Sequence, residues 1–100
     1  MLNQIILVGR LVSDPEINET ENGKKGIIKL AIPRSFKNVD GEYETDFVEC
    51  VLWKAVADNV KEYCKKGDVV GVKGRIQSNE NGIEVIAEKV TFLSSSRKED

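Results

Sequence analysis

One stretch of this 100-residue chain, residues 54–66, has the apolar spacing of a helix. Its apolar residues recur every three or four positions and form one stripe, made of Val56, Ala57, Val60 and Cys64. Elsewhere the apolar residues alternate with polar ones or form short runs, which is typical of β-strands. Because 100 residues are too few for two cores, the chain is predicted to be a single all-β domain with one α-helix.

Five segments have strand patterns, namely residues 4–12, 27–33, 47–53, 69–77 and 83–93. The first is apolar on both parities, so we expect it to be covered on both faces. Asn22-Gly23 marks a turn in the polar stretch that follows it, and Asp40-Gly41 marks the tip of a long hairpin arm over residues 34–46. Asn81-Gly82 predicts an antiparallel hairpin between the last two strands.

Three further local features follow from single residue types. Pro33 is expected to interrupt strand pairing because proline has no N–H to donate. Gly67 is predicted to be the C′ residue of the helix, with Lys65 and Lys66 in its last turn. The glycines of residues 69–77 indicate a bulge or sharp curvature.

The order of three strands, one helix and a hairpin is the connectivity of the OB-fold, a five-stranded barrel with the helix between strands 3 and 4. We expect this domain to span residues 1–93 and residues 94–100 to fray, because they offer nothing to bury. There is no linker and no internal repeat. OB-folds bind oligonucleotides, oligosaccharides or proteins, so the fold alone does not give the function.

Composition narrows the classes of function. A net charge of −2 excludes a uniformly basic surface, so phosphate binding would need a local basic stripe. The chain has no histidine, which removes the commonest general base and argues against an enzyme. Cys50 and Cys64 lack the spacing of metal ligands and are expected to be free, packed thiols, so no metal or cofactor is predicted. No run is long enough to span a bilayer and the first residues lack a secretory signal pattern, so a cytoplasmic protein without membrane contact is expected.

Aromatic and basic residues share the same predicted elements. Phe47 and Trp53 have one parity on the third strand, opposite an apolar face that does not require them, and Phe36 lies in the polar arm. Binding of single strands needs π-faces for bases and cations for phosphates, so nucleic acid is the leading predicted ligand. The candidate DNA-binding residues are Arg10, Arg34, Phe36, Lys37, Phe47, Trp53, Lys54, Lys66, Lys73 and Arg75.

Other interpretations remain open from the residues alone. An aromatic residue in a strand is often part of the core, and Trp53 next to the helix could pack between the barrel and the helix. An assembly adaptor could use the same aromatic residues to contact protein. A nuclease would need Asp40, Glu42, Glu44 and Asp46 to gather around a metal ion, but alternating acids beside a glycine are more typical of a solvated turn.

The sequence also resembles the bacterial single-stranded DNA-binding protein family over residues 3–93. The resemblance is carried by Asn3 to Leu11 with Asp14-Pro15-Glu16, by Arg34-Ser35-Phe36-Lys37-Asn38, by the run from Phe47 to Trp53, and by Tyr63 to Ile76. It implies a nucleoid-associated protein of DNA replication, repair and recombination that coats single strands as a homotetramer. It also implies base stacking at Phe36, Phe47 and Trp53, with Arg10, Lys66 and Arg75 on or beside the DNA path.

The chain departs from that family's pattern in two places. The hairpin arm between Gln77 and Ile83 is short and has no aromatic residue, and the acidic tail that recruits replication proteins is not expected here. The family's short relatives include primosomal replication protein N, a dimeric OB-fold protein. The alternative within this fold is therefore a dimeric assembly adaptor of that type.

Overall fold

The structure, a computed structural model, describes residues 1–95, so most of the segment expected to fray lies outside the described residues. Its elements are β1 (Ile5–Leu11), β2 (Glu16–Thr20), β3 (Gly23–Lys37), β4 (Tyr43–Trp53), α1 (Lys54–Tyr63), β5 (Val69–Asn79) and β6 (Gly82–Ser94). The five predicted strands and the helix are all present. The last strand extends to Ser94, which pairs with Val69 and was expected to lie beyond the fold.

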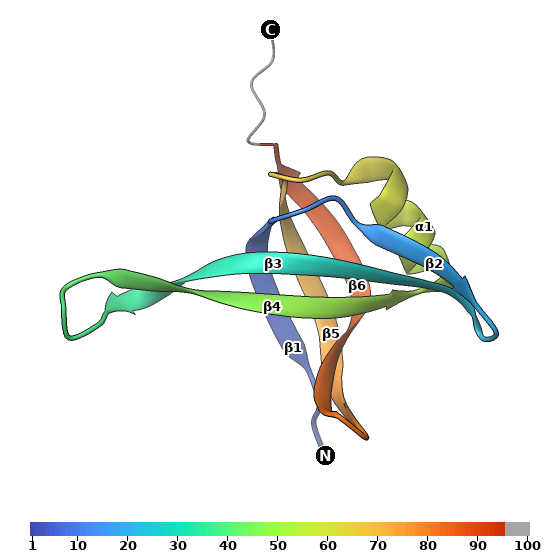
Figure 1. The fold of residues 1–100 in the computed structure, drawn as a ribbon, viewed down its shortest axis with the longest axis horizontal. Coiled ribbons are helices and arrows are strands. Elements are labelled where there is room, and N and C mark those ends of the chain that lie inside the picture. Colours follow the sequence, from blue (N-terminus) through green and yellow to red (C-terminus); the bar gives the residue numbers. More distant parts are fainter. Residues whose placement is uncertain (96–100) are drawn as a thin grey trace, which may run out of the picture.

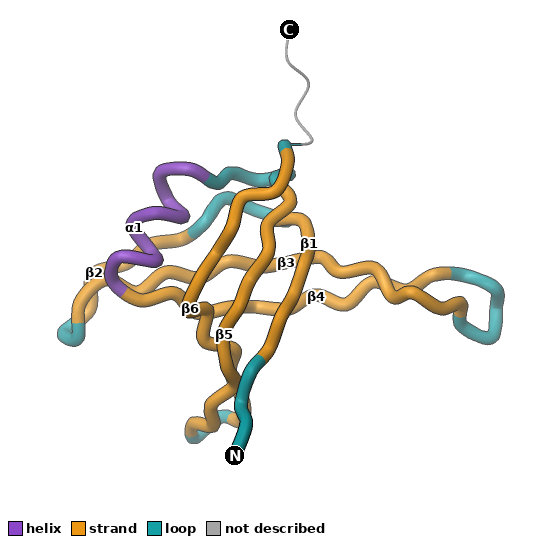
Figure 2. The backbone as a smooth tube through the Cα atoms, turned by 180° about the vertical axis from the view of Figure 1, so that it is seen from behind, coloured by secondary structure: helices purple, strands orange, loops and turns teal. Residues whose placement is uncertain are grey.

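Five strands close into a barrel whose neighbours run β1, β5, β6, β4, β3 and back to β1 (Figure 1). The closing contact places Arg10 opposite Ala31 and Leu11 opposite Leu30. β4 and β6 are parallel and the other pairs are antiparallel. The helix lies between the third and fourth strands of the barrel, which are β4 and β5, so the predicted OB-fold is confirmed. Seen from behind, α1 lies beside β2 and β6 at one side of the barrel (Figure 2).

One strand was missed by the sequence analysis. β2 pairs antiparallel with the start of β3 through the Asn22-Gly23 turn, in a stretch that we expected to be irregular. Gly23 has a φ of +110°, so the turn itself was correctly placed. β2 was not predicted because four of its five residues are exposed and only Ile17 is half-buried, so the strand has no apolar alternation.

The interior of the barrel is filled by the inward-facing side chains of its strands and by the apolar stripe of α1. The buried core comprises Leu11, Ile28, Leu30, Cys50, Leu52, Ala57, Val60, Cys64, Val70, Val72 and Ala87. Both cysteines are free and buried, as predicted. Burial, followed by the charge of Glu49, raises the pKa of the Cys50 thiol to about 11, which keeps it protonated and unreactive.

The predicted end of the helix is wrong. α1 ends at Tyr63, because Cys64 is extended (φ −121°, ψ 141°), and Lys65 and Lys66 therefore lie outside its last turn. The Asp68 carboxylate accepts a hydrogen bond from the Lys65 N–H at 2.9 Å and holds the chain in a turn instead. Gly67, with a φ of +94°, serves this turn and donates its N–H to the Leu11 carbonyl at 2.9 Å.

β3 and β4 continue beyond the barrel as the predicted arm, which Figure 1 shows projecting to one side. The Asn38 side chain closes its tip by accepting the N–H groups of Asp40 at 2.9 Å and Glu42 at 3.0 Å. Gly41 follows with a φ of +78°. The strand register shifts between Pro33 and Lys37, directly after the proline expected to interrupt it. Within residues 1–95 no helix is long and apolar enough to cross a membrane.

The bulge expected from the glycines of β5 lies between Lys73 and Gly74, where the pairing with β6 shifts. A Cβ at Gly74 would overlap the carbonyl oxygen of Ile86 and lie 2.9 Å from its carbonyl carbon. At Gly71, a Cβ would meet Leu93 at 3.6 Å, an ordinary contact. Gly74 is thus required by the close approach of the β6 backbone.

Gly74→Ala should lower the free energy of unfolding by about 3 kcal/mol, the upper part of the range for overpacking, because the obstacle is backbone. Gly71→Ala is the matched control and should cost much less. Urea unfolding of both variants measures the difference. Equal losses in the two variants would contradict the assignment of the bulge.

Candidate nucleic-acid interface

The ribbon formed by β3 and β4 presents one predicted aromatic residue openly on the outside of the barrel. Phe47 lies opposite Ala31 in the strand register, so the nearest cross-strand side chain is a methyl group. The Phe47 side chain is left 66% exposed. A residue buried in the core would be covered, so the core interpretation of Phe47 is excluded.

Phe36 lies farther along the same ribbon, on the part of β3 that has left the barrel. It is 63% exposed and therefore also lies outside the core. The arm has no interior in which a ring of this size could be buried. Phe36 and Phe47 thus offer two exposed rings on one continuous ribbon, and exposed rings are what base stacking requires.

Trp53 ends β4 just before α1 and is half-buried. It lies opposite Lys25 in the register, and the Lys25 ammonium is 5.8 Å from the centroid of its ring. Partial burial next to the helix fits packing between barrel and helix, and the remaining exposure fits a base. The role of Trp53 in stacking therefore stays a prediction.

Three of the predicted cations lie on or close to this ribbon. Lys37 belongs to the arm, and its ammonium is 5.7 Å from the Tyr43 ring centroid. Lys54 begins α1 with a φ of +52°, and its side-chain carbons lie beside the turn at Gly23. Arg75 reaches the same outward face by register, because it lies opposite Ile86 and Ile86 lies opposite Val51 of β4.

The remaining predicted cations lie on or near β1 and β5. Arg10 lies opposite Ala31, which lies opposite Phe47, so the register places Arg10 in the same cross-strand row as that ring. Arg10 donates to the Gly67 carbonyl at 2.8 Å, and the backbone N–H of Lys66 donates to the Asp14 carboxylate at 2.8 Å, so both lie at the corner where β1 meets the turn before β5. Lys73 lines a separate groove on the outer wall of β1, β5 and β6, together with Ile6 and Val8. The structure therefore does not gather all ten predicted residues around one point.

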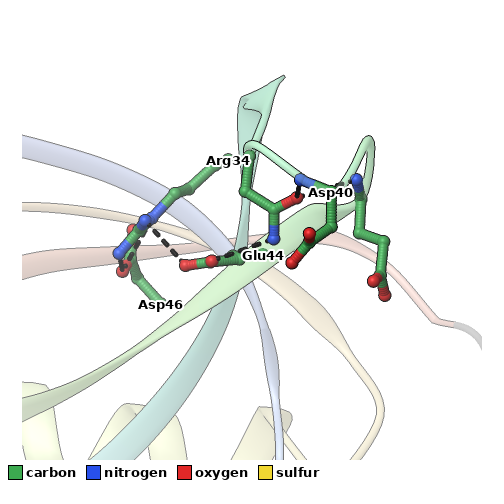
Figure 3. Close-up of polar contacts among 6 residues, drawn as sticks. Arg34, Asp40, Glu44 and Asp46 are labelled. Atoms are coloured by element: carbon green, nitrogen blue, oxygen red, sulfur yellow. Dashed lines mark hydrogen bonds and ion pairs between the residues drawn. The ribbon is translucent and has the colours of Figure 1, made fainter.

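Arg34 is occupied by the acids of the arm (Figure 3). Its guanidinium donates to both oxygens of Asp46 at 2.8 and 3.1 Å and to Glu44 at 2.9 Å. The second oxygen of Glu44 accepts from the Asn38 amide at 3.0 Å. The hydrogen bond from Arg34, followed by its charge, holds the pKa of the Asp46 carboxyl below its ordinary value of 3.8. In this arrangement Arg34 neutralises two carboxylates that would otherwise repel phosphate.

The four acids of the arm do not form a metal site. Glu44 and Asp46 are paired with Arg34 (Figure 3). Asp40 and Glu42 are exposed at the tip. Among residues 1–95, no group of three or more potential metal-ligating side chains comes together. The arrangement of the arm acids therefore gives the nuclease interpretation no support.

A model of the single-strand binding protein family matches residues 2–93. The chain belongs to the single-strand binding protein family. The match covers the helix and the five barrel strands except Ser94, the last residue of β6, and it confirms the resemblance found in the sequence.

Individual members of the family are similar over nearly the whole chain. Single-stranded DNA-binding protein B of Bacillus subtilis is 45% identical, over 99% of this chain and 96% of the relative. The single-stranded DNA-binding protein of Halalkalibacterium halodurans is 48% identical, over 93% of this chain and 61% of the relative. The solved structure of a Plasmodium falciparum SSB complex with ssDNA has a TM-score of 0.76 and 25% identity, over 94% of this chain and 96% of that chain.

Two residues of the ribbon in this family member were not predicted from the sequence. Lys25 and Tyr43 both lie in lysine–aromatic contacts, yet neither was a candidate site residue. Lys25 lies in the part of β3 before the predicted start of the strand at residue 27, so its cross-strand partner could not be assigned. The signal for Tyr43 was its odd parity, shared with Phe47 and Trp53, which becomes visible once β4 is extended to residue 43.

In Arg34→Gln, the pKa of the Asp46 carboxyl should rise toward 3.8, its ordinary value, because its main hydrogen-bond donor is gone. Carboxyl ¹³C shifts followed through an acid titration measure this pKa. Since the folded-state pKa lies below that of the unfolded chain, the pairing stabilises the fold above the unfolded pKa, and the stabilisation is lost as pH falls through the folded value.

Lys37→Gln is the control, because it removes an arm cation that makes no ion pair with Asp46. An Asp46 pKa that is the same in wild type and Arg34→Gln would show that the pairing does not persist in solution.

Proposed function

We propose that this protein binds single-stranded DNA without sequence preference, by stacking bases on Phe36, Phe47 and Trp53 and by contacting phosphates through lysine and arginine. The observation that carries the proposal is the exposure of Phe36 (63%) and Phe47 (66%) on one ribbon of a protein from this family. Every base has a π-face, so stacking tolerates any sequence, and no bond is made or broken.

The relatives support this ligand. Those compared above are named single-stranded DNA-binding proteins, and the similar solved structure is a complex with single-stranded DNA. Coating of exposed strands during replication, repair and recombination is the cellular role that we attach to this binding. Because the net charge is −2, the phosphate contacts must come from cations placed locally along the path.

Titration of labelled oligo-dT into the protein tests the proposal. Phe36→Ala and Phe47→Ala should each weaken binding by about 5- to 150-fold, the equivalent of about 1–3 kcal/mol for a lost stacking platform, with thermal stability nearly unchanged. Trp53 emission should fall on binding. The logarithm of the association constant should decrease linearly with log salt, by about 0.7 for each phosphate contacted.

Val39→Ala is the matched control, because Val39 is fully exposed on the same arm but has no π-face. It should bind like wild type. No binding at low salt would remove the proposal and favour an assembly adaptor whose aromatic residues contact protein. A large loss of stability in the Phe47 variant would instead indicate a structural role for that ring.

We also propose that the protein is a homo-oligomer, a tetramer or a dimer, that uses the outer face of β1. Ile6 and Val8 are 69% and 53% exposed on this face, and they line a groove of about 280 Å³ with Gly71 and Thr91. Exposed apolar side chains on the outer face of a small barrel are typical of a surface that pairs with another copy.

Light scattering at micromolar concentration should give a multiple of the 11.2 kDa chain mass. Ile6→Glu should shift the mass toward 11.2 kDa while the chain stays folded, because a carboxylate would be buried without a partner in the interface. Ile83→Glu, at an exposed apolar residue in the β5–β6 hairpin, is the control. A wild-type monomer at this concentration would overturn the proposal.

A further inference from the structure

We propose that two lysine–aromatic pairs, Lys25 with Trp53 and Lys37 with Tyr43, each hold one nucleotide, with its base on the ring and its phosphate on the ammonium. The inference rests on the proposed function and deepens it. It adds Tyr43 as a stacking residue and Lys25 as a phosphate ligand. Neither residue was among the candidates drawn from the sequence.

The two pairs have the same construction. Lys25 lies directly opposite Trp53 in the antiparallel register of β3 and β4, and Lys37 lies directly opposite Tyr43. The ammonium groups are 5.8 and 5.7 Å from their ring centroids, within the range of a cation–π contact. One such contact could be incidental, but two at equivalent cross-strand positions of one ribbon indicate a repeated unit.

The aromatic rings of both pairs lie on the same face of the ribbon. Along β4, Tyr43, Phe47 and Trp53 are separated by even numbers of residues, so their side chains leave the strand on the same parity. At a rise of about 3.4 Å per residue, Tyr43 is about 14 Å from Phe47 and Trp53 is about 20 Å beyond it. Tyr43, which is 60% exposed, therefore extends the row of rings toward the tip of the arm.

The acids next to Tyr43 do not block this position. Glu44 follows it on β4 with the opposite parity, and Glu42 lies before the strand, exposed at the tip of the arm. Glu44 also accepts hydrogen bonds from Arg34 and Asn38, so part of its charge is neutralised within the arm. The face that carries Tyr43 is thus left to its own cation, Lys37.

The relative strengths of the contacts decide what happens when a strand arrives. An exposed cation–π contact changes an equilibrium constant by about 2- to 5-fold. Stacking of a base on an aromatic ring changes a binding constant by about 5- to 150-fold. A base therefore displaces the ammonium from the ring, and the lysine, still anchored opposite that ring, is within reach of the phosphate that follows the base.

The lysines are free to make this move. In the part of the chain that the structure describes, neither Lys25 nor Lys37 takes part in an ion pair. Their neighbour Lys24 contrasts with them, because its ammonium pairs with Asp58 of α1 at 2.9 Å. Adjacent residues of a strand point to opposite sides, so Lys24 faces the helix while Lys25 covers Trp53. This makes Lys24 a matched control for Lys25.

The test compares Lys25→Gln, Lys37→Gln and Lys24→Gln in oligo-dT titrations at several salt concentrations. Each of the first two should weaken binding and reduce the slope of log K against log salt by about 0.7, the value for one phosphate contact on a single strand. Lys24→Gln should leave the slope unchanged. If Lys25 and Lys37 only cover the rings, their removal would tighten binding at an unchanged slope, and that result would overturn the inference.

Tyr43 is tested by two variants. Tyr43→Ala should weaken binding by about 5- to 150-fold, and Tyr43→Phe, which keeps the ring, should bind like wild type. Thermal melts of both variants verify the fold. If the wild-type protein binds oligo-dT and Tyr43→Ala binds equally well, the inference is overturned and the proposed function stands. If the wild-type protein does not bind oligo-dT at low salt, the proposed function itself is overturned.

Discussion

The antiparallel pairing of β3 with β4 is the interaction on which the rest of the molecule depends. At one end it forms a wall of the barrel, with Ile28 and Leu30 pointing inward. At the other end it continues into solvent as the arm. A slip of one residue would turn the core side chains outward and Phe47 inward, so burial of the core fixes the place of the exposed rings. The register that folds the barrel therefore also places the aromatic residues of the binding surface.

The arginine and the lysines of the ribbon make different electrostatic contacts. The Arg34 guanidinium forks across Asp46 and Glu44, which suits its fixed planar geometry. Lys25 and Lys37 instead rest over aromatic rings, where a flexible stem and a single ammonium can be displaced. A chain with a net charge of −2 thereby keeps mobile positive charge where its rings are exposed.

Much of the fold could be predicted because it depends on local signals. Alternation in residues 27–33 and 47–53 gave the inward side chains, and Asn22-Gly23, Asp40-Gly41 and Asn81-Gly82 gave the turns. β2 could not be predicted because it forms only by pairing with β3. The end of α1 could not be predicted because the Asp68 carboxylate sets it. In the site, the exposed aromatic rings could be predicted from the residue types alone. The occupation of Arg34 and the place of Lys25 depend on cross-strand register, which the sequence does not show.

The shift between Pro33 and Lys37 has a consequence for how such a ribbon can vary. Four steps along β3, from Pro33 to Lys37, match two along β4, from Thr45 to Tyr43, so β3 contains two extra residues. Because this number is even, Lys37 keeps the parity of Lys25. A single inserted residue would invert every side chain between it and the tip, sending rings and cations to opposite faces. The arm can therefore be lengthened or shortened without loss of its chemistry only in steps of two residues, while the barrel beneath it stays the same.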